Sequence, residues 1–308
     1  MRVSAHHAAF VQHLSLRYIH KMPNSSFPTP LVSVPWLAEH LSDPQIRVVD
    51  ASMYLPAAGR DAHAEYRAAH IPGAVFADLG WLSDSSAPFP HTLLGAADFA
   101  MRMGALGIGN DDSVVVYDSS GQNFSAPRFW WMLRTFGHAR VAVLDGGIGK
   151  WQRDGHGVTT DIASIVPRVF DAALNADRVR DLAAMRENLH TRAAQVADAR
   201  SPGRFAAREP EPRAGVRGGH IPGSRNVHYA SLVNADGTLR SADDLRAVIT
   251  AAGVDLTRPI VASCGTGVTA CAVVLALDVL GVHDAAVFDG SWSEWGSASD
   301  TPVATGSD

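Results

Sequence analysis

Residues 260–277 read IVASCGTGVTACAVVLAL, in which an apolar β-branched run, a short loop with two glycines and an alanine- and leucine-rich run follow one another. The first run has the composition of a buried parallel strand, and the last run predicts a helix. In α/β domains, ligands bind where the carboxyl end of a strand meets the next helix. The loop that starts at Cys264 is therefore the candidate site of an α/β domain.

Cys264 lies in a loop that suits an anionic sulfur. Gly265 and Gly267 permit left-handed backbone angles, so successive amide groups can point inward as an anion-binding nest. The N-terminus of the following helix adds partial positive charge. Both features favour the nucleophilic thiolate and predict a reactive Cys264 that needs no histidine as a base.

The second cysteine, Cys271, lies among alanines and valines of the predicted helix, and we expect it to be a small core residue. The two cysteines are seven positions apart, which is about two helical turns and beyond the reach of a disulfide. The cysteine content is therefore typical of a reducing compartment.

The same landmarks occur twice along the chain, at an offset of about 145 to 150 residues. The first set is VVDA (48–51), HIPG (70–73), VVVY (114–117) and VAVLDGG (141–147). The second set is VADAR (196–200), HIPG (220–223), PIVASC (259–264) and AAVFDGS (285–291). This repeat predicts a tandem duplication of an α/β domain, each copy a parallel sheet flanked by helices.

The length of 308 residues also suits two domains. We expect an N-terminal extension at 1–30, a first domain at 31–153, a linker at 154–174 and a catalytic domain at 175–308. The linker lacks a clear period and contains Gly155, Gly157 and Pro167. The extension has no acidic residue, as in transit peptides, but it lacks strong amphipathicity, so we expect a flexible tail. This predicts a cytoplasmic protein, or a mitochondrial one if the extension is a transit peptide.

The composition excludes several classes of protein. Hydrophobic residues make up 46% and charged residues 19% of the chain, as in globular proteins rather than disordered or fibrous ones. A net charge of -5 without a basic stripe disfavours nucleic acid as a partner. The longest apolar stretch, Ala270–Leu277, is too short to span a membrane. Neither cysteine has the paired spacing of a zinc site, so we expect no metal and no other cofactor.

The repeat provides an internal control for the candidate residues. Asp118 occupies the position of Cys264 in the first half, so only the second half carries a nucleophile, and the first half is expected to contribute a face of the cleft. His70 and His220 occur in both halves and are therefore expected to be structural. The same argument makes Asp198 and Asp289 structural.

The duplicated HIPG and DGG/DGS landmarks, Asp118 and the sequence CGTGVTA at 264–270 together resemble the two-domain rhodanese superfamily over residues 31–298. The resemblance is to its 3-mercaptopyruvate sulfurtransferase branch, because thiosulfate-using members place basic residues directly after the cysteine, where this chain has Gly265 and Thr266. It implies an enzyme without a cofactor that takes sulfur from a small-molecule donor as a persulfide. The sulfur then passes to cyanide or to a thiol, such as thioredoxin or a low-molecular-weight thiol.

The same resemblance assigns roles to individual residues. It implies that Arg204 and Arg213, in the stretch GRF…EPEPR, bind the donor, together with the loop residues Gly265, Gly267, Val268 and Thr269. Pro210, Pro212 and Gly215 make a continuous helix there unfavourable, so we expect both arginines to project from a loop. Arg208 and Arg217 are interpreted as solvated surface charges.

The family's proton relay has only part of its residues in this chain. His91 matches the family's histidine, and Thr266 replaces a serine while keeping its hydroxyl. The family's second acid aligns with Gly80, two residues after Asp78. The relay is therefore incomplete, and the proton is expected to come from water or from Thr266.

Three other functions are compatible with some of these features. A cysteine phosphatase needs an arginine six residues after the cysteine, where Ala270 lies, so this class is disfavoured. A thiosulfate sulfurtransferase is the runner-up. A persulfide relay module, in which Cys264 carries sulfur without turnover, is the remaining alternative.

Overall fold

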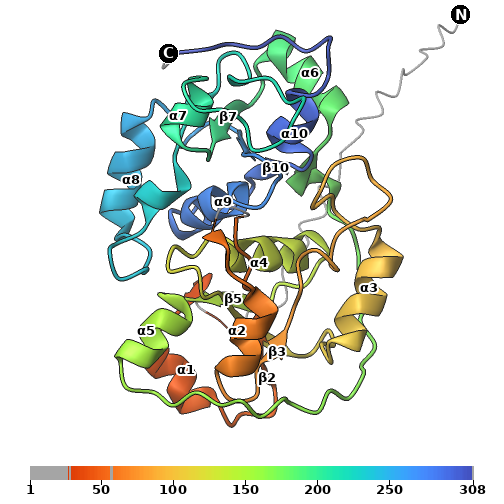
Figure 1. The fold of residues 1–308 in the computed structure, drawn as a ribbon, viewed down its shortest axis with the longest axis vertical. Coiled ribbons are helices and arrows are strands. Elements are labelled where there is room, and N and C mark those ends of the chain that lie inside the picture. Colours follow the sequence, from red (N-terminus) through yellow and green to blue (C-terminus); the bar gives the residue numbers. More distant parts are fainter. Residues whose placement is uncertain (1–26, 28, 56–57, 307–308) are drawn as a thin grey trace, which may run out of the picture.

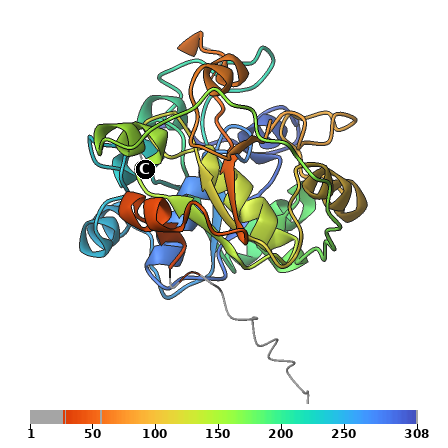
Figure 2. The ribbon, with the colours of Figure 1, turned by 90° about the horizontal axis from the view of Figure 1, so that it is seen from below.

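The computed structural model describes residues 27, 29–55 and 58–306. They form two five-stranded parallel sheets, each covered by helices, and the two domains lie one above the other (Figure 1). Seen from below, the first domain lies in front of the second (Figure 2). The predicted tandem α/β duplication is thereby confirmed. Within the described ranges, no helix is long and apolar enough to cross a membrane.

The first sheet has the strand order β1-β5-β4-β2-β3. Its strands are β1 (Leu31–Val32), β2 (Ile46–Asp50), β3 (Val75–Phe76), β4 (Ser113–Tyr117) and β5 (Val141–Leu144). Successive side chains of β4 point to opposite faces. Val114 and Val116 belong to the cluster formed with α3 (Ala96–Ala105) and α4 (Ala126–Thr135). Val115 and Tyr117 belong to the cluster formed with α1 (Val34–His40), α2 (Ala62–Ala68) and α5 (Gly147–Arg153).

The second sheet has the equivalent order β6-β10-β9-β7-β8. Its strands are β6 (Val179–Arg180), β7 (Gln195–Asp198), β8 (Arg225–Asn226), β9 (Ile260–Ser263) and β10 (Ala286–Phe288). The helices are α6 (Leu182–Thr191), α7 (Pro202–Phe205), α8 (Ala242–Ala251), α9 (Ala270–Val279) and α10 (Ser291–Trp295), with 3-10 turns η2 (Ala176–Arg178) and η3 (Tyr229–Leu232). Ser241 starts α8 by accepting a hydrogen bond from the Asp244 amide at 3.2 Å.

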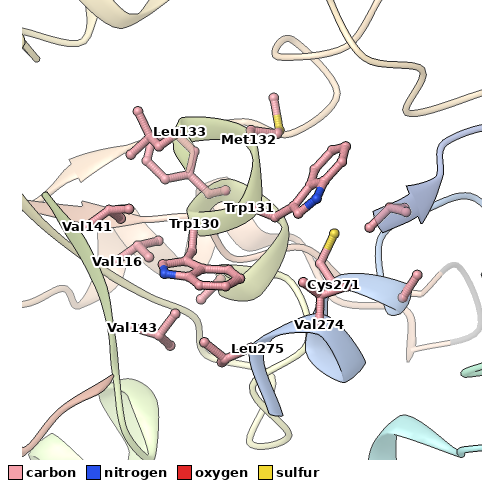
Figure 3. Close-up of a cluster of buried hydrophobic side chains, with 14 of the residues drawn as sticks. Val116, Trp130, Trp131, Met132, Leu133, Val141, Val143, Cys271, Val274 and Leu275 are labelled. Carbon is pink, nitrogen blue, oxygen red and sulfur yellow. The ribbon is translucent and has the colours of Figure 1, made fainter. Parts of the chain in front are cut away.

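The helices α4 and α9 pack against each other, so one apolar cluster runs through both domains. Figure 3 shows Trp130 and Trp131 of α4 beside Cys271, Val274 and Leu275 of α9. Cys271 is fully buried, which confirms the expectation of a core residue. Burial raises the pKa of its thiol to about 12, so Cys271 stays neutral and unreactive at physiological pH.

Two equivalent aspartates fasten each domain to a loop of the other. The Leu93 amide of the first domain donates to Asp289 Oδ2 at 2.7 Å. The Leu239 amide of the second domain donates to Asp145 Oδ1 at 2.8 Å. Because both halves use this aspartate in the same way, Asp289 has the structural role expected from the repeat.

The linker predicted at 154–174 contains no helix or strand and runs over the first domain (Figure 1). The Arg168 amide donates to the Gly104 carbonyl and the Ala173 amide to the Phe136 carbonyl, both at 3.0 Å, and Phe170 is buried. The linker is thus fixed to the first domain. The exact domain boundaries stay a prediction, and almost all of the predicted extension, residues 1–26 and 28, lies outside the described residues.

Candidate active site

Cys264 directly follows β9 and faces a cavity of about 510 Å³. Its amide donates to Ser291 Oγ at 3.1 Å, and its carbonyl accepts from the Trp292 amide at 2.9 Å. The side chain is only 1% exposed, yet it lines the cavity wall. The thiol is therefore shielded from bulk solvent but open to a ligand that enters the cavity.

Both domains form the cavity, as expected from the repeat. The first domain contributes the apolar or aromatic residues Met53, Tyr54, Leu55 and Pro90 together with His91. The second domain contributes the arginines and the loop that contains Cys264. A ligand bound there contacts a charged wall on one side and a largely apolar wall on the other.

The loop after Cys264 requires its second glycine. Gly267 has a φ of +79°, and a Cβ atom there would lie 2.7 Å from the Asp289 carbonyl oxygen. Within the described protein, the amides of Gly265, Thr266, Gly267 and Val268 donate to no acceptor. These free donors surround the start of α9, which is the arrangement that binds an anion.

His91 and Thr266 meet across the domain interface. His91 Nδ1 lies 3.0 Å from Thr266 Oγ1, and Arg128 Nη2 donates to the His91 carbonyl at 2.6 Å. Burial, with the positive charges of Arg128 and Arg213, lowers the pKa of His91 to about 4. The imidazole is therefore neutral at pH 7.

Gly80, which aligns with the second acid of the family's relay, lies in a turn after Asp78. Asp78 Oδ1 accepts a hydrogen bond from the Gly80 amide at 2.7 Å, and Asp78 is exposed. No carboxylate hydrogen bonds to the His91 ring among the described residues. The histidine and the threonine are thus brought together without the third member of the family's relay.

Arg204 lies beside the loop that contains Cys264, with its Nη2 atom 3.0 Å from the point where a Cβ of Gly265 would lie. Its Nε and Nη2 atoms donate to Glu211 at 3.3 Å and 2.6 Å, and Glu211 also accepts from the buried Arg200 at 2.8 Å. The expected loop position is wrong for Arg204, because Pro202 starts the one-turn helix α7 there. Arg213 does lie outside any helix or strand.

Arg213 is joined to the same loop through a serine. Its Nη1 atom donates to Ser293 Oγ at 2.7 Å, and Ser293 Oγ donates to the Gly265 carbonyl at 2.7 Å. Burial and the neighbouring Arg204 lower the pKa of Arg213. Two guanidinium groups thus converge on one side of Cys264, where they favour an anionic ligand.

The residues expected to be structural have that role in the structure. His70 and His220 are fully buried, with Nδ1 atoms 2.7 Å and 2.9 Å from the carbonyls of Tyr66 and Phe205. Asp198 forms a buried ion pair with Arg200 at 2.6 Å.

Of the two arginines interpreted as surface charges, Arg208 is exposed as expected. The interpretation is wrong for Arg217, which donates to the carbonyls of Gly296 at 3.0 Å and Thr301 at 2.9 Å and so fixes the segment after α10. Arg217 binds backbone carbonyls, which every residue has, so the sequence could not reveal these partners.

Sequence reasoning missed Glu211, Ser293, Tyr229 and the buried Arg128. Glu211 lies within the EPEPR stretch, between the two arginines, so a search for their carboxylate partner could have found it. The others approach the site only through folding. The described residues contain no group of three or more histidine, cysteine or acidic side chains that could hold a metal ion.

The chain is similar to known proteins over most of its length. The family model of the rhodanese-like domain matches residues 33–154 and 181–298. The 3-mercaptopyruvate sulfurtransferase of Escherichia coli K12 is 45% identical over 276 residues, which cover 89% of this chain and 98% of that protein. The thiosulfate sulfurtransferase of Rattus norvegicus is 44% identical over 271 residues, covering 86% and 91%.

A solved structure agrees with these relatives. The crystal structure of SseA from Escherichia coli, a 3-mercaptopyruvate sulfotransferase, superimposes with a TM-score of 0.79 at 42% identity and covers 86% of this chain and 99% of that one. Both halves of the chain match the same domain family, and both sheets have the same strand order. The chain therefore belongs to the rhodanese family and contains two rhodanese-like domains.

Proposed function

We propose that the protein is a sulfurtransferase that moves sulfur from 3-mercaptopyruvate through a persulfide on Cys264 to a thiol or cyanide, and releases pyruvate. The observation that carries the proposal is the convergence of Arg204 and Arg213 on the cavity that Cys264 lines. One guanidinium suits the carboxylate of the donor and the other its keto oxygen.

The identity of the donor rests on charge near the sulfur. The relatives do not decide it, because a mercaptopyruvate enzyme and a thiosulfate enzyme are 45% and 44% identical to the chain. The residues directly after Cys264 are the uncharged Gly265 and Thr266, which offer no counter-charge for a dianion at that point. Thiosulfate is the runner-up donor.

In the first half-reaction, the Cys264 thiolate attacks the sulfur of 3-mercaptopyruvate. An S–S bond forms while the C–S bond breaks, and its electron pair goes to the methylene carbon as the enolate of pyruvate. The proton of the donor's own thiol reaches that carbon through Thr266 or water, so the products are a persulfide anion and pyruvate. His91 is neutral and orients the Thr266 hydroxyl at 3.0 Å.

The persulfide is held by the loop that follows Cys264. The amides at Gly265, Gly267 and Val268, together with the N-terminus of α9 at its N-cap Thr269, supply hydrogen-bond donors and partial positive charge to the outer sulfur. In the second half-reaction, the acceptor thiolate attacks that sulfur and regenerates the Cys264 thiolate.

The acceptor proposed for the persulfide is thioredoxin or a low-molecular-weight thiol. The apolar side chains Met53 and Leu55 of the first domain border the cavity, and Leu55 is 44% exposed. Both cysteines are free thiols, which suits a cytoplasmic location, whereas a mitochondrial one depends on the N-terminal extension.

The test is kcat/KM for 3-mercaptopyruvate and for thiosulfate on one preparation, with dithiothreitol as the acceptor. We expect a preference of at least about tenfold for mercaptopyruvate, because two arginines bind its carboxylate and keto group. A preference for thiosulfate would establish the runner-up function. Loading of one sulfur per chain without turnover would identify a persulfide relay module instead.

A further inference from the structure

Tyr229 is fixed in the wall of the cavity that contains Cys264. It starts η3, from which Val227 and His228 separate β8, and its amide donates to the Ala199 carbonyl at 3.2 Å. Its ring contacts Phe124 and His228 edge-on, with centroids 5.7 Å and 5.1 Å away. The tyrosine is half-buried and lines the cavity. Backbone and ring contacts therefore define where its hydroxyl lies.

The hydroxyl of Tyr229 has no hydrogen-bond partner within the described part of the chain. The second tyrosine of the cavity wall, Tyr54, differs in this respect. Its hydroxyl donates to Glu65 Oε2 at 2.5 Å and also contacts Ser119 Oγ. Tyr229 thus offers the cavity a hydrogen-bond donor that the protein does not already use.

Tyr229, Arg204 and Cys264 line the same cavity, and their charges act on one another. Burial raises the pKa of Tyr229, the positive charge of Arg204 opposes that rise, and the negative charge of Cys264 adds to it. The charges of both the nucleophile and the arginine assigned to the donor therefore affect the pKa of the phenol. Because its pKa lies above the ordinary value near 10, it stays protonated at neutral pH and can only donate to an anion.

The other domain shows what this position contains when no nucleophile is present. Val227 donates to the Asp198 carbonyl and Ala77 to the Asp50 carbonyl, both at 2.8 Å, so the two segments are equivalent. Two residues further along, Tyr229 corresponds to Leu79, which is buried in the core. The phenol therefore occurs only in the half that carries Cys264.

We propose that the Tyr229 hydroxyl, in addition to the guanidinium assigned to the keto oxygen of the donor, donates a hydrogen bond to that oxygen as it becomes the enolate oxygen, and so contributes to specificity for an α-keto acid. The inference rests on the proposed function and extends it. When the C–S bond breaks, the electron pair is shared between the methylene carbon and the keto oxygen, and a fixed donor stabilises the charge on oxygen. Tyr229 keeps its proton throughout.

Sulfur donors without a keto group distinguish a hydrogen bond from Tyr229 to the enolate oxygen from a hydrogen bond to the persulfide. Thiosulfate and inorganic polysulfide give the same Cys264 persulfide, but they release sulfite or a shorter polysulfide and form no enolate. A hydrogen bond to the enolate oxygen therefore affects only mercaptopyruvate, whereas one to the persulfide affects all three donors.

The experiment measures single-turnover persulfide formation in the full-length wild type and in Tyr229→Phe with each of the three donors. We expect Tyr229→Phe to load about 10- to 100-fold more slowly from mercaptopyruvate, the effect of losing one donor to a developing oxyanion. Loading from thiosulfate and from polysulfide should change by less than about twofold, because those reactions form no oxyanion at carbon. Near-ultraviolet circular dichroism checks that the ring packing survives.

Tyr66→Phe is the matched control, because it removes the same atom from a tyrosine that donates to the Ala74 carbonyl at 2.8 Å, outside the cavity wall. It should load normally from every donor. Binding of oxalate, which resembles the enolate of pyruvate, gives a readout without turnover and should weaken about tenfold in Tyr229→Phe only.

Unchanged mercaptopyruvate loading in Tyr229→Phe, or an equal loss with all donors, would overturn the inference. A wild type that loads from polysulfide but not from mercaptopyruvate would instead overturn the proposed function.

Discussion

The loops after β4 and β9 occupy equivalent places in the two domains, but one holds a carboxylate and the other a thiol. In the first domain, Asp118 Oδ2 accepts from the amides of Ser125 and Ala126 at 3.0 Å, and Oδ1 accepts from Ser120. In the second domain, the amides after Cys264 have no acceptor among the described residues. The first domain thus shows this loop binding an anion of its own, and the second keeps the same kind of donors for the sulfur.

This comparison separates two uses of one backbone arrangement. A carboxylate that fills the loop stabilises the fold but leaves no donor for a ligand. A thiol at that position leaves the donors free for an incoming or transferred sulfur. The difference lies in one side chain and in the loop length, since α4 starts eight residues after Asp118 and α9 six residues after Cys264.

The largest effect is expected from Cys264→Ser. Sulfur transfer should fall by at least about 1,000-fold, because the hydroxyl stays protonated and cannot form a persulfide. The melting temperature should stay within a few degrees, because the side chain keeps its size. Cys271→Ala is the control and should retain transfer, since Cys271 lies in the core between α4 and α9. Turnover by Cys264→Ser would refute its role as the nucleophile.

Arg204→Ala tests the side of the cavity that the second domain supplies. That side carries the arginines, whereas the side from the first domain is largely apolar. We expect KM for mercaptopyruvate to rise about 100-fold, in line with the loss of one charge-assisted contact to a carboxylate. Stability should change little, because Glu211, the partner of Arg204, keeps its ion pair with Arg200 at 2.8 Å. Steady-state kinetics and thermal unfolding check both parts. Unaltered kinetics would remove Arg204 from the site.

Asp118→Ala tests the equivalent loop in the first domain, where a carboxylate takes the place of the thiol. Removing the carboxylate leaves the amides of Ser120, Ser125 and Ala126 without an acceptor, which should cost about 3 kcal/mol of unfolding free energy. Persulfide formation should persist in the folded fraction, because Asp118 does not line the cavity. Denaturant unfolding and loading assays measure the two effects, and a stable variant would show that the carboxylate does not hold this loop.

The smallest expected effect is on the unfolding free energy and concerns Asp50 and Asp198, the last residues of the equivalent strands β2 and β7. Asp198 pairs with Arg200, whereas Ser52 occupies the equivalent place beside Asp50. Burial raises the pKa of Asp50 from 3.8 to about 6, so its ionisation costs stability above pH 6 and costs nothing below pH 3.8. At pH 8, Asp50→Asn should therefore raise the unfolding free energy by about 1–2 kcal/mol. This is less than the full pKa shift of Asp50 would give, because an amide accepts the Ser52 hydrogen bonds less strongly than a carboxylate.

Unfolding of the wild type and Asp50→Asn across pH 4 to 8 measures this gain. It should shrink toward zero as the pH falls through 6 to 4. An advantage that is the same at every pH would show that ionisation of Asp50 is not its cause.

The sequence predicted the parts of the site that lie close together along the chain. A strand, Cys264, two glycines and a helix follow one another within eighteen residues, so local backbone preferences are enough to place them. The repeat then identified Asp118 as the counterpart of Cys264. Residues that reach the site from other segments, such as Arg128 and Tyr229, have no local pattern to reveal them.

The sequence by itself thus determined the duplicated α/β fold and the one half that carries a nucleophile, because hydrophobic periodicity and glycine positions act locally. Only the tertiary structure decided that His91 reaches Thr266 from the first domain, that Glu211 fixes Arg204, and that the Tyr229 hydroxyl is unpaired in the cavity. These relations depend on how α4 packs against α9, since that contact sets which side chains of the two domains meet.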